Sequence, residues 1–150
     1  LYNSQSRDKY VQYFFKLWQG RETLKNFTDS YQQVKNLTVS AKVPMVAVVF
    51  PLFGLPVDDK YPFEEIHQIV QKISEEQSIT LLDLLPAYRG LPLERLQVII
   101  GKDFHPNEIG HRIASEEIYN FLQQQKLIPE SAVISKRVLE RTSINLDKLD

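Results

Sequence analysis

The sequence has 150 residues, of which 43% are hydrophobic and 25% are charged, and its net charge is −1. This composition is typical of one compact globular domain and excludes a disordered or fibrous chain. Neither a nucleic-acid nor an anionic-membrane partner is expected, because Lys and Arg form no concentrated block. No transmembrane segment is expected, because no apolar run reaches the roughly 18 residues of a membrane span. Without cysteine there is no thiolate chemistry.

Two helices are expected at the start of the chain. Over residues 7–19, aromatic and apolar side chains recur at helical spacing and stop at Gly20, which predicts a helix with a buried aromatic face. The same periodicity over residues 21–41 predicts a second, amphipathic helix. Asn26 and Asn36 each begin an Asn-x-Thr glycosylation pattern, but both fall inside this helix and are interpreted as helix surface.

A change of period then predicts two strands with a helix between them. Residues 43–50 form a continuous apolar run rich in β-branched side chains, which is typical of a strand buried on both faces, and residues 78–84 form another. Residues 62–76 carry acidic residues in a first turn and an apolar stripe at helical spacing. His67 lies off that stripe and is expected to face solvent. The order of elements favours a doubly wound α/β fold with a parallel sheet.

The loop over residues 51–61 leaves the carboxyl end of the first predicted strand. Open α/β sheets bind ligands at this edge. The candidates for a substrate-binding wall are the apolar residues Pro51, Leu52, Phe53 and Leu55. Packing of the loop on its own domain is an equally open alternative.

Asp103 and His105 are the most chemically suggestive pair in the sequence. Pro106 fits the first turn of a helix, and the periodic residues 109–122 predict a long amphipathic helix, so His105 is expected at or just before its start. A carboxylate beside an imidazole is built like the orienting acid and the base of a Ser-His-Asp triad, although a helix cap beside a solvated histidine is the alternative. A metal site with His111 is disfavoured, because residues six apart do not share a helical face. The sequence carries no glycine-rich phosphate loop, and no cofactor is expected.

The segment from Asp103 to His111, Asp-Phe-His-Pro-Asn-Glu-Ile-Gly-His, resembles the last motif of the SGNH or GDSL-type serine hydrolases. In that family an Asp and a His precede the C-terminal helix. The order of the predicted elements agrees with the resemblance, which covers residues 1–124 and corresponds to the second half of the family's fold. It implies a three-layer α/β/α sandwich with a flavodoxin-like parallel sheet. Residues 125–150 are then a C-terminal extension, with a short helix expected over residues 131–141.

The resemblance implies an ester hydrolase, lipase-like or esterase-like, with His105 as the catalytic base and Asp103 as its orienting acid. Its substrates would be carboxylic esters, including acyl groups on lipids or carbohydrates. The spacing Asp103-Phe104-His105 is one residue shorter than the family's commonest Asp-x-x-His.

The resemblance also implies parts that this sequence does not contain. The Gly-Asp-Ser motif of the nucleophile and the Gly and Asn motifs of the oxyanion hole do not occur in it. The serine is therefore expected from a segment upstream of Leu1 or from a companion chain, and the chain alone is expected to be inactive and to associate with that missing half or with itself. The alternative function is a non-catalytic α/β domain that serves binding or assembly.

Overall fold

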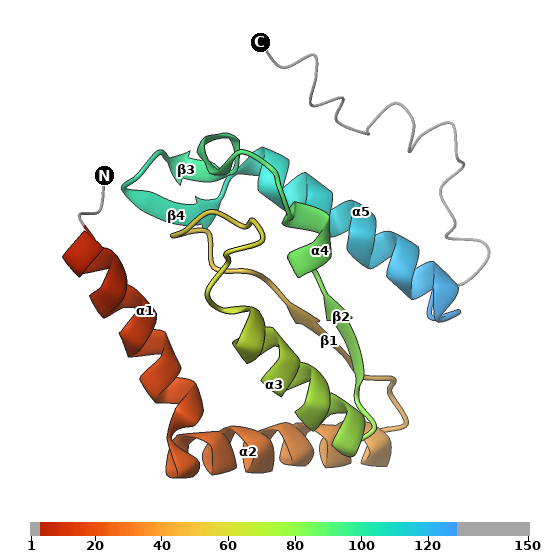
Figure 1. Cartoon of the computed structure of the whole chain (residues 1–150). Coiled ribbons are helices and arrows are strands. Elements are labelled where there is room, and N and C mark those ends of the chain that lie inside the picture. The colour runs from red at the N-terminus through yellow and green to blue at the C-terminus, as the bar shows by residue number, and fades with distance from the viewer. Residues whose placement is uncertain (1–3, 129–150) are drawn as a thin grey trace, which may run out of the picture.

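The computed structural model of the protein describes residues 4–128 and shows a mixed α/β fold (Figure 1). The helices are α1 (Ser4–Gln19), α2 (Arg21–Ser40), α3 (Glu64–Glu76), α4 (Leu85–Tyr88) and α5 (Glu108–Gln124), with a 3₁₀ turn η1 at Leu93–Arg95. The strands are β1 (Val46–Val49), β2 (Thr80–Asp83), β3 (Gln97–Ile99) and β4 (Asp103–Pro106). The helix expected over residues 131–141 lies outside the described residues.

Strands β1 and β2 form a parallel pair, which confirms the predicted strand–helix–strand unit. Val46 lies opposite Thr80 and Val49 lies opposite Asp83, and α3 makes the crossover between the two strands. Within residues 4–128 no other strand pairs with them. The predicted burial of β1 on both faces is wrong, because all four residues of the strand are only half-buried and a cavity lies against one face of the strand.

Helices α1 and α2 form an L-shaped frame beside α3 and the parallel strands (Figure 1). The aromatic stripe of α1 packs edge-on against Phe63, with Phe14 at 5.4 Å and Tyr10 at 5.9 Å between ring centroids. Helix α2 has no buried residue. Its contact with α3 is polar: the Tyr31 hydroxyl lies 3.1 Å from Ser74 Oγ. Both predicted N-terminal helices are therefore present, and the first packs by its aromatic stripe as expected.

The hydrophobic core is centred on the loop that follows β1. Phe53, Val57 and Phe63 are almost fully buried, at 3%, 2% and 1% exposure. They pack with residues that follow β2, of which Leu84 and Tyr88 are both at 0%. This loop therefore packs on its own domain, which was one of the two alternatives.

A β-hairpin of β3 and β4 precedes α5. Gln97 pairs with Pro106 and Ile99 pairs with Asp103, with an irregularity between the two pairs. Pro106 therefore ends a strand, and its predicted place in the first turn of a helix is wrong. The physical reason is Asn107, whose Oδ1 accepts hydrogen bonds from the backbone N–H groups of residues 109 and 110, so that Asn107 caps α5 and the helix begins at Glu108.

Candidate active site

Asp103 and His105 lie two residues apart on β4, so their side chains emerge on the same face of the strand. His105 Nδ1 lies 2.6 Å from Asp103 Oδ1. The backbone N–H of His105 donates to the same oxygen at 3.0 Å. These two bonds, of which the backbone bond has the larger effect, hold the pKa of the Asp103 carboxyl below its usual value. The predicted acid–imidazole pair is therefore present as a local contact.

The contact fixes how His105 presents its ring. Ionised Asp103 is only an acceptor, so Nδ1 of His105 carries the proton and Nε2 offers a lone pair. The His105 side chain is 87% exposed. No residue in the described range 4–128 makes a hydrogen bond to its Nε2. The ring can thus accept a proton from a hydroxyl group brought to this surface.

Asn107 joins the hairpin to α5 behind His105. Besides capping the helix with Oδ1, it donates from Nδ2 to the carbonyl oxygens of Arg95 at 2.9 Å and of Gln97 at 3.3 Å. Its backbone N–H donates to Leu96 O at 2.7 Å. Sequence reasoning missed this role, although an asparagine directly before a periodic helical segment is a helix-start signal.

Gln97 ties the same hairpin to the loop after β1. The residue is 5% exposed, and its Nε2 donates to Phe53 O at 2.7 Å. Its Oε1 accepts from the backbone N–H of Gly101 at 2.8 Å. No pattern in the sequence indicates this contact, because it joins residues 44 positions apart.

The first turn of α5 is packed closely against β4. A Cβ added to Gly110 would lie 2.8 Å from Pro106 Cβ, so only glycine allows this approach. The Tyr88 hydroxyl donates to Gly110 O at 2.6 Å. Burial raises the pKa of Tyr88 to about 12, so the hydroxyl keeps its proton for this bond. The strand that carries His105 is therefore fixed to the helix on one side and to the core on the other.

Two cavities open beside His105 and share Leu52, Phe53 and Phe104. One, of about 310 Å³, is lined by Phe50, Pro51, Leu52, Phe53, Phe104, His105, Pro106 and His111. The other, of about 490 Å³, is lined by Tyr10, Leu52, Phe53, Lys102, Asp103, Phe104 and His105. The structure thus brings three of the four predicted wall residues to the histidine. The fourth, Leu55, is 5% exposed and belongs to the core.

Neither cavity is lined by a serine, threonine or cysteine among the described residues. The hydroxyls of Ser40 and Ser115 donate to backbone carbonyls of their own helices, each at 2.8 Å. The backbone N–H of Leu52, a residue that lines both cavities, donates to the Tyr61 hydroxyl at 2.7 Å. The described part of the chain therefore places an imidazole and a carboxylate at this site, but no hydroxyl or thiol side chain that could act as a nucleophile.

A second Asp–His pair lies inside the fold. His67 is 5% exposed, so its predicted exposure to solvent is wrong. Its position on α3 faces the end of β2, where its Nδ1 lies 2.7 Å from Asp83 Oδ1. Desolvation acts to raise the pKa of Asp83, but the bonds from His67 and from the Leu85 N–H outweigh it and hold the pKa below its usual value. Arg89 adds a smaller charge effect in the same direction.

The described part of the chain offers neither a metal site nor a membrane-spanning helix. Between residues 4 and 128, no group of three or more His, Cys, Asp and Glu side chains is placed to hold a metal ion. No helix in that range has the length and apolar character needed to cross a membrane. Comparison of the chain with family models, curated proteins and solved structures finds no match. The geometry around His105 is therefore the feature of the molecule that bears on its function.

Proposed function

We propose that this chain supplies the base and the orienting acid of a serine ester hydrolase of the SGNH type. The serine would come from a segment outside residues 1–150 or from a companion chain. The observation that carries the proposal is the 2.6 Å contact between His105 Nδ1 and Asp103 Oδ1, which leaves Nε2 facing outward on a ring that is 87% exposed.

His105 would act twice in each turnover. Its Nε2 takes the proton of the serine hydroxyl as the serine oxygen attacks the ester carbonyl, and the resulting imidazolium gives this proton to the departing alcohol. A water molecule then repeats the sequence on the acyl-enzyme and releases the carboxylic acid. Asp103 holds the ring and stabilises its charged form during both steps. The apolar side chains of Leu52, Phe53 and Phe104, which both cavities share, suit the acyl part of a carboxylic ester, on a lipid or a carbohydrate.

The proposal includes a larger fold. Strand β1 pairs on one edge only within the described residues. Residues 50–53, which follow its carboxyl end, line the cavity together with His105. A serine-bearing segment that adds parallel strands to the free edge of β1 would bring its own carboxyl ends to the same side. The product would be a three-layer α/β/α sandwich of the flavodoxin-like type.

A second candidate function is a non-catalytic domain for binding or assembly. It is favoured by the lack of any hydroxyl side chain in the walls of the two cavities beside His105, as far as the described residues go. On this account Asp103 orders the turn before α5, and His105 is a surface residue.

Substitution of His105 separates the two functions. In the assembled protein, His105→Ala should lower turnover of 4-nitrophenyl acetate by several orders of magnitude. His111→Ala is the matched control, because His111 lines one of the same cavities but has no carboxylate partner in the described structure, and it should leave turnover within a few-fold. The 150-residue chain alone should show no hydrolysis that depends on His105. Unchanged turnover in a folded His105→Ala protein would contradict the proposal and favour the binding domain.

A further inference from the structure

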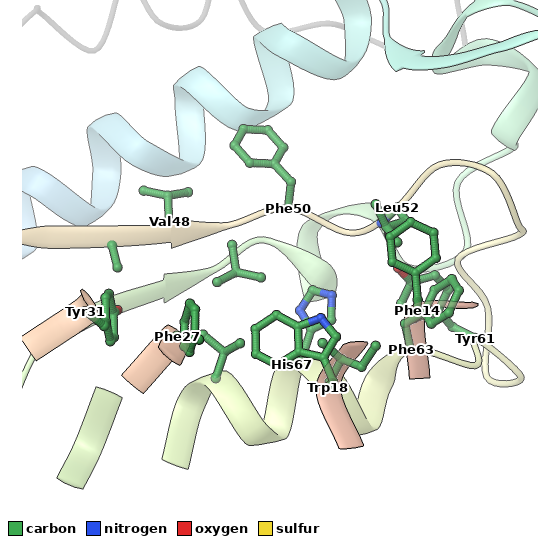
Figure 2. A pocket seen from close by; sticks show the side chains of 14 residues that line it. Phe14, Trp18, Phe27, Tyr31, Val48, Phe50, Leu52, Tyr61, Phe63 and His67 are labelled. Atoms are coloured by element: carbon green, nitrogen blue, oxygen red, sulfur yellow. The ribbon is translucent and has the colours of Figure 1, made fainter. Parts of the chain in front are cut away.

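A third cavity, of about 390 Å³, lies between α1, α2 and α3 on the side of β1 opposite α5 (Figure 2). Figure 2 shows Val48 and Phe50 on the α5 side of the strand. Successive side chains of a strand alternate, so Ala47 and Val49 point toward the cavity. The volume lies within the usual range of small-molecule sites. It lies apart from the Asp103–His105 pair, neither of which lines it.

Aromatic side chains from α1, α2 and the loop before α3 form much of the wall of this cavity. Trp18 of α1 meets Phe27 edge-on at 5.0 Å between ring centroids. Phe27 in turn stacks on Tyr31 at 5.3 Å along α2. Phe63, before α3, is 1% exposed and closes one end together with Tyr61. Such walls favour a compact apolar group over a charged one.

The hydroxyl groups in the walls are already bonded. The Tyr31 hydroxyl contacts Ser74 Oγ at 3.1 Å, and the Tyr61 hydroxyl accepts from the backbone N–H of Leu52 at 2.7 Å. A ligand therefore meets these two side chains mainly through their rings.

His67 is the ionisable side chain of the wall that keeps a polar atom free. Its side chain is 6% exposed, and Nδ1 is turned to Asp83, which lines a separate polar cleft on the other side of the ring. His67 also lines the aromatic cavity, where Figure 2 shows it with Trp18 and Phe63. Nε2 has no hydrogen-bond partner in residues 4–128 and is not among their fully enclosed polar atoms, so it is accessible to a ligand.

The Asp83 contact decides what kind of group Nε2 can bind. Because the carboxylate only accepts, Nδ1 of His67 carries the proton and Nε2 is an acceptor in the neutral ring. A ligand must then bring a donor. A carboxylate ligand would add a second negative charge near Asp83, which is held 2.7 Å from the same ring, and this arrangement is unfavourable.

We propose that this cavity binds a small neutral alcohol, with its apolar body among the aromatic rings and its hydroxyl donating to Nε2 of His67. The site goes beyond the proposed hydrolase function and does not depend on it. Ligands of this class carry one hydroxyl on a compact hydrocarbon, such as a cyclohexyl group.

The test uses three probes of similar shape on the unaltered 150-residue chain. Cyclohexylmethanol has the hydroxyl, ethylcyclohexane replaces it with a methyl group, and cyclohexanecarboxylate replaces it with an anion. Trp18 is the only tryptophan in the sequence and lines the cavity, so its fluorescence reports binding directly. The alcohol should bind about tenfold more tightly than the hydrocarbon, as one net hydrogen bond allows, and more tightly than the carboxylate.

Two substitutions locate the binding. Ala47→Leu fills the cavity without touching His67 or Asp83 and should abolish binding of the alcohol, whereas Val98→Leu on the exposed hairpin should not change it. His67→Phe keeps a flat ring but removes Nε2, and should make the alcohol bind no better than the hydrocarbon. If His67→Phe does not fold, the comparison of the three probes on the unaltered chain still shows whether the hydroxyl group strengthens binding.

Three results would overturn the proposal. The first is equal affinity for the alcohol and the hydrocarbon on the unaltered chain. The second is binding that survives Ala47→Leu. The third is no binding of the alcohol by the folded chain, whether sedimentation shows that chain to be monomeric or associated.

Discussion

His105 is bonded twice to one oxygen of Asp103, through its ring nitrogen Nδ1 at 2.6 Å and through its backbone N–H at 3.0 Å. The backbone bond fixes the orientation of the Asp103 carboxylate, and the carboxylate then fixes the orientation of the His105 ring. A pair this close in sequence needs no long-range packing to form, which explains why both side chains keep their geometry at the surface.

Asp103→Asn should weaken this arrangement without unfolding the chain. An amide accepts more weakly than a carboxylate and does not stabilise an imidazolium, so turnover of an aryl ester by the assembled protein should fall by about one to four orders of magnitude. The side chain of Asp103 is 37% exposed, so thermal unfolding should change little. Equal turnover in the two proteins would show that Asp103 only orders the turn.

Gly110→Ala should destabilise the fold although it lies in a helix. Alanine in place of a helical glycine usually adds about 0.5–1 kcal/mol of stability. Here the new Cβ would lie 2.8 Å from Pro106 Cβ, and overpacking of this kind costs about 1–3 kcal/mol. Urea unfolding gives the difference, with Ser115→Ala on the exposed face of the same helix as the control. A gain in stability at Gly110 would contradict the close packing of β4 on α5.

Asp83→Asn tests the buried pair through the pH dependence of stability. The pKa of Asp83 is lowered in the folded chain from its ordinary value of 3.8, so its contribution is complete above that value and is lost as pH falls through the folded pKa. At neutral pH the substitution gives buried His67 an amide in place of a carboxylate, which is a weaker acceptor. It should therefore lower the free energy of unfolding by about 1–3 kcal/mol. The difference in free energy of unfolding between the two proteins, measured with urea, should become smaller as the pH is lowered below 3.8. Parallel curves would contradict the assigned pair.

The edge of β1 that no strand between residues 4 and 128 covers should make the isolated 150-residue chain associate. An unpaired strand edge beside apolar surface favours pairing with another strand. Sedimentation velocity should show dimers or larger species, and Val46→Lys should reduce them more than Val98→Lys on the hairpin does. A compact monomer at high concentration would count against a sheet completed by further strands.

Local patterns in the sequence predicted the elements with strong periodicity. The aromatic stripe of α1, the apolar stripe of α3 and the β-branched run of β1 each gave the right kind of element. The parallel pairing of β1 with β2 followed from the helix between them. These features depend on residues within one turn or one strand of each other, which is what periodicity reports.

Features that depend on contacts between distant segments were missed. The hairpin of β3 and β4 was also missed, although it is a local element. Its one signal in the sequence is Gly101, whose φ of 67° permits the turn between the strands. The burial of His67 depends on Asp83, 16 residues away. The packing of residues 51–63 on residues that follow β2 was left open as one of two alternatives, because it depends on contacts between distant segments. At the candidate site, the sequence predicted the contact between Asp103 and His105 and three of the residues that line the cavities beside them, but not the contacts of Gln97 and Asn107.

Covalent labelling tests the central claim most directly. The assembled protein is treated with a fluorophosphonate, which reacts with a serine that a base activates, and the modified residue is identified by mass spectrometry. The account predicts one labelled serine outside residues 1–150, and it predicts that His105→Gln slows labelling by at least about a hundredfold while His111→Gln does not. Labelling at the same rate in the His105→Gln protein, or no labelled serine in an assembled and folded protein, would contradict it.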